Sequence, residues 1–158
     1  MAQVASAGAH GARTIRNTAT KHLLGAAEKG DAIAQFNLGV FLDNRVDDNG
    51  HAAIGDRTAA IEWLSRAAGQ DLACAQIKLG EIYAESADSP KHCIASCAWF
   101  LRAIPHAKGA HRQKALSGFQ RVSAQMAPAQ IVTARHLASS DADGTTEDSP
   151  VTLEAYLE

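Results

Sequence analysis

The nine residues AQIKLGEIY, at positions 75–83, have a near copy at positions 34–42, which read AQFNLGVFL. Ala, Gln, Leu and Gly stand in the same register in both stretches, and positions 34 and 75 are 41 apart. Alanines just upstream obey the same offset of 41, with Ala26, Ala27 and Ala32 matching Ala67, Ala68 and Ala73. Repetition at a fixed period of this size is typical of stacked supersecondary units. The sequence therefore predicts a helical repeat.

The composition fits one domain that is long enough to bury a core. Of the 158 residues, 46% are hydrophobic but only 8 are aromatic, so small side chains must let the helices approach closely. The net charge of −2 selects no particular class of partner. No apolar run approaches the roughly 20 residues that span a bilayer, and residues 1–20 do not resemble a secretory signal. Three cysteines are a poor disulfide framework, so we expect a cytoplasmic protein.

Three segments of different composition divide the chain. Residues 1–16 are rich in Ala, Gly and Ser without a helical period, and we expect a disordered tail. Residues 17–138 carry the helical pattern and form the predicted domain. Residues 139–158 hold six acids and no Lys or Arg, and their first half is rich in turn-forming residues. We therefore expect a second disordered tail there.

Helices are predicted from the spacing of apolar residues and from their capping residues. The expected ranges are about 17–29, 31–43, 57–68, 71–86, 90–104, 108–125 and a short helix from residue 128. Gly30 and Pro105 are placed to end the helices before them. The residues placed to cap the helices that follow them are Asp31, Asp56, Asp71 and Ser89.

Two glycines stand in the middle of predicted helices, where glycine costs about 1 kcal/mol relative to Ala. Because Gly39 and Gly80 occupy equivalent places in the two copies, we expect a side chain of a neighbouring helix to fill the space that a methyl group would take. Trp63 and Trp99 each precede an alanine by four residues and are predicted to pack in the core. The proposed structural positions of the repeat are Ala34, Leu38, Gly39, Trp63, Ala67, Ala75, Leu79, Gly80, Tyr83 and Trp99.

The order of these motifs resembles that of the Sel-one-like repeats, which are relatives of the tetratricopeptide repeats. The shared pattern is Ala-x-x-Trp at 60–63, a double alanine at 67–68, and Ala-x-x-x-Leu-Gly-x-x-Tyr at 75–83. A second Trp motif follows at 96–99, and the resemblance covers about residues 22–138. Residues 126–130 also resemble the terminal capping segment of bacterial members. The chain departs from the pattern where Leu42 replaces a Tyr and where the loops after residues 42 and 83 lack the usual glycines.

The resemblance implies an all-α fold in which antiparallel helix pairs stack into a right-handed superhelical solenoid. It also implies a function: members hold other proteins as scaffolds or adaptors, without catalysis. We accordingly expect a non-catalytic protein-protein interaction module with no cofactor and no small-molecule substrate.

Other kinds of chemistry fit the residues less well. Cys93 and Cys97 lie one helical turn apart beside His92, but no further ligands complete a tetrahedral zinc set, so we expect no metal site. Residues 43–50 resemble a calcium loop superficially, but the Arg and the missing twelfth-position Glu argue against it. His106 and His111 are interpreted as solvated loop residues. Nothing singles out a catalytic nucleophile.

The partner surface is predicted from the first helix of each pair, which lines the concave surface of helix-pair solenoids. Asn37 aligns with Lys78, and Phe41 aligns with Ile82 four residues later on the same face. We predict that these four residues contact a partner protein. The alternative is that Phe41 and Ile82 complete the core.

Charge is distributed unevenly in the second half. No acid occurs between Asp88 and Asp141, whereas this stretch holds Lys91, Arg102, Lys108, Arg112, Lys114, Arg121 and Arg135. The alternative function is therefore a helical protein that binds nucleic acid through residues 91–135. A related hypothesis is that the acidic residues 139–158 contact this basic half.

Overall fold

The computed structural model describes residues 20–44, 55–86 and 89–140, and within these ranges it contains helices and no strand. The chain divides after Ala67 into two compact units. None of the helices in the described ranges is long and apolar enough to cross a membrane. The predicted tail at 1–16 lies outside the described residues, and so does the predicted C-terminal tail from residue 141 onward.

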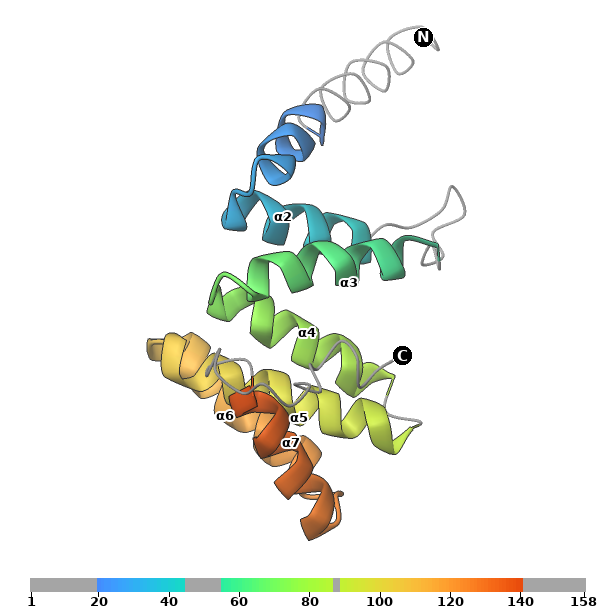
Figure 1. The fold of residues 1–158 in the computed structure, drawn as a ribbon, viewed down its shortest axis with the longest axis vertical. Helices are drawn as coiled ribbons and strands as arrows, with labels where there is room; N and C mark the ends of the chain where they lie inside the picture. The colour runs from blue at the N-terminus through green and yellow to red at the C-terminus, as the bar shows by residue number, and fades with distance from the viewer. Residues whose placement is uncertain (1–19, 45–54, 87–88, 141–158) are drawn as a thin grey trace, which may run out of the picture. The chain divides into compact units, whose positions relative to one another are not determined.

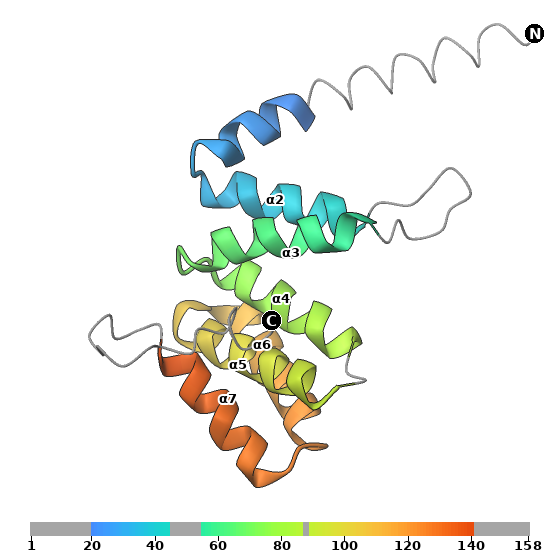
Figure 2. The ribbon, with the colours of Figure 1, turned by 45° about the vertical axis from the view of Figure 1, so that its right-hand side comes forward.

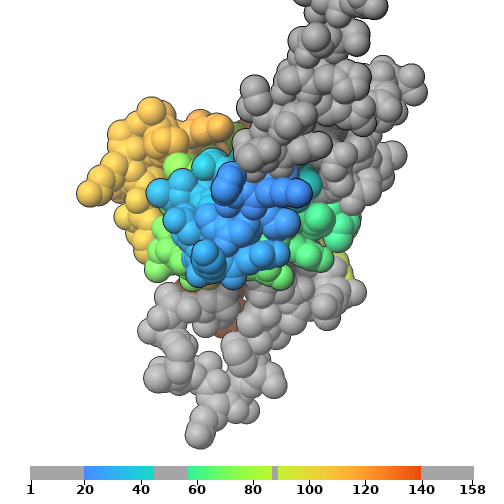
Figure 3. Space-filling model, turned by 90° about the horizontal axis from the view of Figure 1, so that it is seen from above, coloured from blue at the N-terminus to red at the C-terminus, as the bar shows by residue number. Residues whose placement is uncertain are grey.

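The first unit contains a helix at residues 20–28, α2 (Ala32–Asp43) and most of α3 (Gly55–Ala68). Figure 3 shows the helix at 20–28, in blue, beside α2. The core of the first unit is small. Its buried residues are Ala27, Ala34 and Leu38, which are at most 7% exposed. The partly buried side chains around this core are Leu23, Ala26, Phe41, Leu42 and Trp63.

Local sequence signals set the start of α2, as predicted. Gly30 has a φ of 93°, a left-handed conformation that glycine adopts without strain, and its N–H donates to the Ala27 carbonyl at 3.1 Å. Asp31 then caps α2, because its side-chain oxygen accepts the Ala34 N–H at 2.8 Å.

The second unit is built around α5 (Pro90–His106). This helix packs against α4 (Ala73–Glu85), α6 (Gly109–Ser123) and α7 (Pro128–Ser140), as Figures 1 and 2 show. Residues 94–100 of α5 are all buried, which is expected of a helix that is covered on every side. The prediction of helices packed in pairs is confirmed at this level.

The remaining helix boundaries agree with the sequence in part. Ser89 caps α5 by accepting the Lys91 N–H at 3.3 Å, as predicted, and Pro90 is the first residue of the helix. The helix continues one residue beyond Pro105, to His106. Asp56 was expected to cap a helix from residue 57, but α3 begins at Gly55, so Asp56 lies inside it. At the other end, α7 runs through Ser140, two residues into the predicted tail.

The prediction that Asp71 caps α4 is wrong. The helix begins at Ala73 with Leu72 as its N-cap residue, and no side chain caps it. Asp71 instead adopts a φ of 59°, and its N–H donates to the Ala68 carbonyl at 3.1 Å. Asp71 therefore occupies the place in the turn that Gly30 occupies 41 residues earlier.

Mid-helix glycines allow close packing, as expected. A methyl group added at Gly39 would lie 2.6 Å from Leu64 Cγ, and one added at Gly80 would lie 2.9 Å from the ring of Phe100. Both distances are shorter than van der Waals contact. Leu64 and Phe100 are 36 residues apart, the same offset that separates the two tryptophans.

Polar contacts recur at the same two offsets. Gln35 Nε2 donates to the Ala27 carbonyl at 3.0 Å, and Gln76 Nε2 donates to the Ala68 carbonyl at 3.1 Å. The guanidinium group three residues after each tryptophan lies over the indole ring. For Arg66 and Trp63 the distance to the ring centroid is 4.4 Å, and for Arg102 and Trp99 it is 5.0 Å. Such cation-π contacts are worth about 0.5–1 kcal/mol at exposed sites.

Candidate functional site

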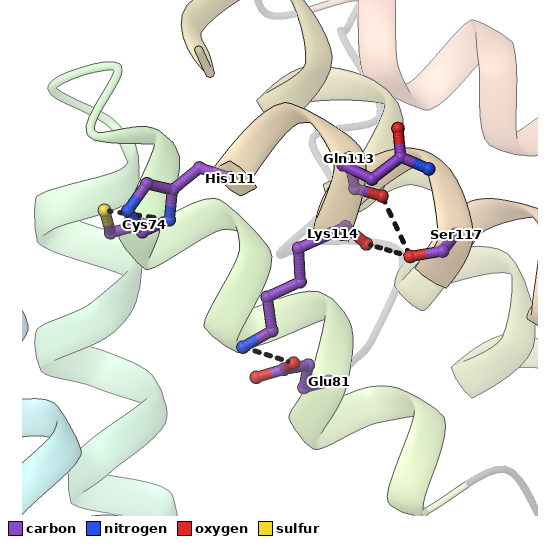
Figure 4. A network of polar contacts seen from close by, with 6 residues as sticks. All are labelled: Cys74, Glu81, His111, Gln113, Lys114 and Ser117. Carbon is purple, nitrogen blue, oxygen red and sulfur yellow. Dashed lines mark hydrogen bonds and ion pairs between the residues drawn. The ribbon is translucent and has the colours of Figure 1, made fainter. Parts of the chain in front are cut away.

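Polar contacts join α4 and α6 along one side of the second unit (Figure 4). Lys114 Nζ lies 2.8 Å from Glu81 Oε1, and Cys74 Sγ lies 3.9 Å from His111 Nδ1. The residue numbers rise together on both helices, so α4 and α6 run in the same direction. The Lys114 and Glu81 side chains are 56% and 26% exposed, so their ion pair borders solvent.

We call the side of the second unit on which these contacts lie the α4–α6 face. On α4 it is formed by residues spaced four, three and four apart, a spacing that keeps them on one side of a helix. They are Cys74, Lys78, Glu81 and Glu85. On α6 it is formed by His111, Lys114 and Arg121. Lys78, which is partly buried, stands between the two contacts in the α4 sequence.

A hollow of about 520 Å³ lies at one end of the face. It is formed where α4 and α6 end and α5 begins, and its lining residues are Glu81, Ala84, Glu85, Cys93, Arg121, Val122 and Gln125. The lining offers carboxylate acceptors, a guanidinium and an amide around small apolar side chains. Such a mixture can bind a polypeptide segment: the polar groups can form hydrogen bonds with the backbone of the segment, and the apolar groups can contact one of its apolar side chains.

The four predicted partner-binding residues have different environments. Asn37 is exposed on α2, while Phe41 packs against the core of the first unit. Lys78 lies on the α4–α6 face. Ile82 is only 1% exposed, so its side chain is not available to a partner and the alternative of a core position applies to it. Asn37 and Phe41 belong to the first unit, and Lys78 and Ile82 belong to the second.

The predicted structural positions of the repeat lie mostly inside their units. The buried ones are Ala34, Leu38, Gly39, Ala67, Ala75, Leu79, Gly80 and Trp99. Trp63 and Tyr83 are partly buried, and the Tyr83 ring lies 5.8 Å from the ring of His92.

The imidazole of His92 and the thiol of Cys97, which the sequence brings near one another, contact different groups. His92 Nδ1 lies 2.6 Å from the Ser86 carbonyl oxygen, and Cys97 Sγ lies 3.3 Å from Met126 Sδ. Burial, and secondarily the neighbouring Cys93 thiol, raises the pKa of Cys97 to about 11. Among the residues that the structure describes, no group of three or more His, Cys, Asp and Glu side chains could hold a metal ion.

The basic residues of the second half are mostly at the surface. The exposed ones are Lys91, Lys108, Arg112, Lys114, Arg121 and Arg135, and Arg102 is partly buried. The aromatic residues among them are less accessible: Trp99 and Phe100 are 3% and 1% exposed. These two rings therefore offer no platform for stacking of bases, which is a common means of binding single strands.

Sequence reasoning missed two parts of this arrangement. The Glu81–Lys114 pair joins residues 33 apart on different helices, and no local pattern marks such a contact. The role of Phe100 could have been found, because Phe100 follows Trp99 as Leu64 follows Trp63. Gly118, which also faces the Phe100 ring, lies 38 residues after Gly80 and so outside the period of 41.

No protein-family model matches the chain, and the comparisons with curated proteins and with solved structures give no match either. The fold and the surface chemistry of the chain itself therefore carry the functional argument.

Proposed function

We propose that this protein is a non-catalytic interaction module of helical repeats, which binds another protein through the α4–α6 face. The observation that carries this proposal is the recurrence of equivalent contacts. Gln35 and Gln76, 41 residues apart, make the same hydrogen bond, and Gly39 and Gly80 accept large side chains that are 36 residues apart. Recurrent packing of this kind supports stacked helix pairs rather than an unrelated helical bundle.

The finer architecture belongs to the same proposal. We propose a right-handed superhelical solenoid of the Sel-one-like type, as found in bacteria, with a cytoplasmic location. In such solenoids the first helix of each pair faces the partner. In the second unit α4 and α6 are the first helices, and their parallel direction and mutual contact agree with this assignment. The α4–α6 face carries side chains of both positive and negative charge, which favours binding of a polypeptide over binding of a polyanion.

The test is capture of proteins from cell lysate on the immobilised full chain, with and without nuclease. We expect specific partners to survive nuclease treatment and to be lost when Lys78→Glu reverses the charge in the middle of the face. Lys91→Glu is the matched control, because Lys91 is an exposed lysine in the first turn of α5. The melting temperature of each variant is measured beside that of the parent, so that a loss of binding is separated from a loss of folding. Lys91→Glu, at an exposed position, should change stability by less than about 0.5 kcal/mol.

The outcomes separate the two candidate functions. Capture that disappears with nuclease would favour the alternative of nucleic-acid binding through residues 91–135. If partners are still captured after nuclease treatment and by the Lys78→Glu variant, the binding surface lies outside the α4–α6 face. Asn37→Glu tests the first unit in the same way, because Asn37 is exposed there.

A further inference from the structure

A second hollow, of about 360 Å³, lies where α7 ends. It is lined by the turn before α4, the last turns of α5 and one residue of α7: Gly69, Asp71, Leu101, Arg102, Pro105, His106 and Ala138. Two basic groups of α5, Arg102 and His106, thus share a hollow with Ala138, which is two residues from the end of α7.

Two cationic side chains follow at once along the chain. Lys108 is the N-cap residue of α6, and Arg112 stands in its first turns, both exposed. The N-terminus of α6 has no side-chain cap and no acidic residue in its first turn. We call Arg102, His106, Lys108 and Arg112 the basic end. The acid that faces it from the turn before α4 is Asp71, whose Oδ1 lies 3.5 Å from His106 Nε2.

The residues after α7 have the opposite charge. Asp141, Asp143, Glu147 and Asp148 follow Ser140 without any Lys or Arg among them. Since a residue spans at most about 3.6 Å, Asp141 and Asp143 must lie within about 11 Å of the end of α7. They also follow the C-terminus of a helix, where the macrodipole disfavours negative charge. The short tether keeps these acids within reach of the basic side chains near the end of α7, and the helix dipole gives them no favourable interaction at the helix C-terminus itself.

From this geometry we propose that residues 141–148 dock on the basic end of the same chain and screen it from other polyanions. The proposal concerns the chain's own segment and does not depend on the partner of the α4–α6 face. The proposed docking site includes only some of the basic residues of the second half. Lys91 lies at the opposite end of α5, and Lys114 already pairs with Glu81. Tethering gives the acids an effective concentration in the millimolar range, so weak ion pairs suffice for docking.

A spin label in the full chain tests this contact. In a Cys74→Ser, Cys93→Ser background, Ser149→Cys carries a nitroxide, while the fully buried Cys97 stays unlabelled. A freely moving tether of nine residues already has a root-mean-square span of about 17 Å. Some broadening of nearby amide signals is therefore expected without docking, and a control must subtract it.

The control replaces the four acids by their amides: Asp141→Asn, Asp143→Asn, Glu147→Gln and Asp148→Asn. Docking predicts a larger loss of amide signal at residues 102–112 with the native acids than with the amides. The difference should vanish in about 1 M salt, where the Debye length is about 3 Å. Lys108→Gln with Arg112→Gln should reduce the loss in the same way, whereas Lys91→Gln should leave it unchanged.

A second measurement needs no cysteine change. Amide chemical shifts of the unlabelled parent and of the four-amide chain should differ at residues 102–112 and agree along α4. Equal broadening in the labelled pair, or identical shifts at residues 102–112 in the unlabelled pair, would overturn the proposal.

Discussion

The ring of Phe100 lies close to two glycines, one on α4 and one on α6, and alanine at either position should destabilise the second unit. A methyl group at Gly80 would lie 2.9 Å from Phe100 Cδ1, and one at Gly118 would lie 2.5 Å from Phe100 Cζ. Phe100 is 1% exposed. The buried ring therefore has little free space into which it could move away from a methyl group at either position.

The size of the effect follows from two opposing terms. Adding a methyl group to a well-packed core costs about 1–3 kcal/mol. Replacing glycine by alanine inside a helix stabilises the helix by about 1 kcal/mol, because alanine has the higher helix propensity. The shorter distances at Gly118 place it near the upper end of the packing cost, so we expect net destabilisation of about 2 kcal/mol at Gly118 and about 1 kcal/mol at Gly80. One kcal/mol corresponds to a shift in Tm of about 4–8 °C for a unit of this size.

Thermal and urea unfolding, followed by circular dichroism, measure these changes. Gly25→Ala is the control, because Gly25 lies in the helix at 20–28 and a methyl group there meets no atom within 4 Å. This variant gains helix propensity without a packing cost and should be more stable than the parent. In a Phe100→Leu background the cost of Gly118→Ala should shrink, because the smaller side chain vacates the space.

The reasoning fails if Gly118→Ala raises Tm as Gly25→Ala does, since the ring would then not occupy this space. It also fails if the cost of Gly118→Ala is the same with Phe100 and with Leu at that position. In that case the destabilisation would have a cause other than contact with the ring.

Three further predictions concern residues of the second unit. Asp71→Gly should raise the free energy of unfolding by up to about 1 kcal/mol in urea titration, because glycine adopts the φ of 59° without strain. The exposed pair with His106 contributes less than this, so a loss above 1 kcal/mol would contradict the strain argument. For the thiols, we expect iodoacetamide to modify Cys74 well before Cys97 in the folded protein, as read by peptide mass mapping. Since the pKa of Cys97 is raised to about 11, the native state holds its proton after the unfolded state has lost it. Stability should then fall between about pH 9 and 11, and Cys97→Ala should remove this part of the pH dependence; an unchanged pH dependence in that variant would refute the assignment.

Sequence reasoning succeeded where the decisive interactions are local. Asp31 and Ser89 cap helices that begin within three residues of them, and the energetic reason is contained in that short stretch. The mid-helix glycines were also predictable, because a costly residue at two equivalent positions needs a packing explanation. These signals are sufficient to predict the helices of the residues that the structure describes, and most of their boundaries to within two residues.

The candidate site was less accessible to such reasoning. The offset of 41 places Phe41 and Ile82 at equivalent positions, but it does not say how deeply each is buried, and Ile82 is in the core. How deeply a side chain is buried depends on which other helices pack over it. The Glu81–Lys114 pair likewise depends on the distance between two helices, which neither helix encodes alone.

The error at Asp71 shows what the two copies share. Under the offset of 41, Asp71 matches Gly30 and Leu72 matches Asp31, so an acid that caps in the first copy has no counterpart in the second. The backbone nevertheless makes the same turn, with positive φ at both Gly30 and Asp71.

In each copy one carbonyl at the C-terminal end of the helix before the turn accepts two hydrogen bonds. One comes from the N–H of the turn residue and the other from a glutamine eight residues further on. Ala27 accepts from Gly30 N–H and Gln35 Nε2, and Ala68 accepts from Asp71 N–H and Gln76 Nε2. A buried amide is costly unless it is bonded. Each glutamine therefore ties the start of its own helix to the turn before it, and this explains why Ala-Gln stands at the start of both copies while the capping residue differs.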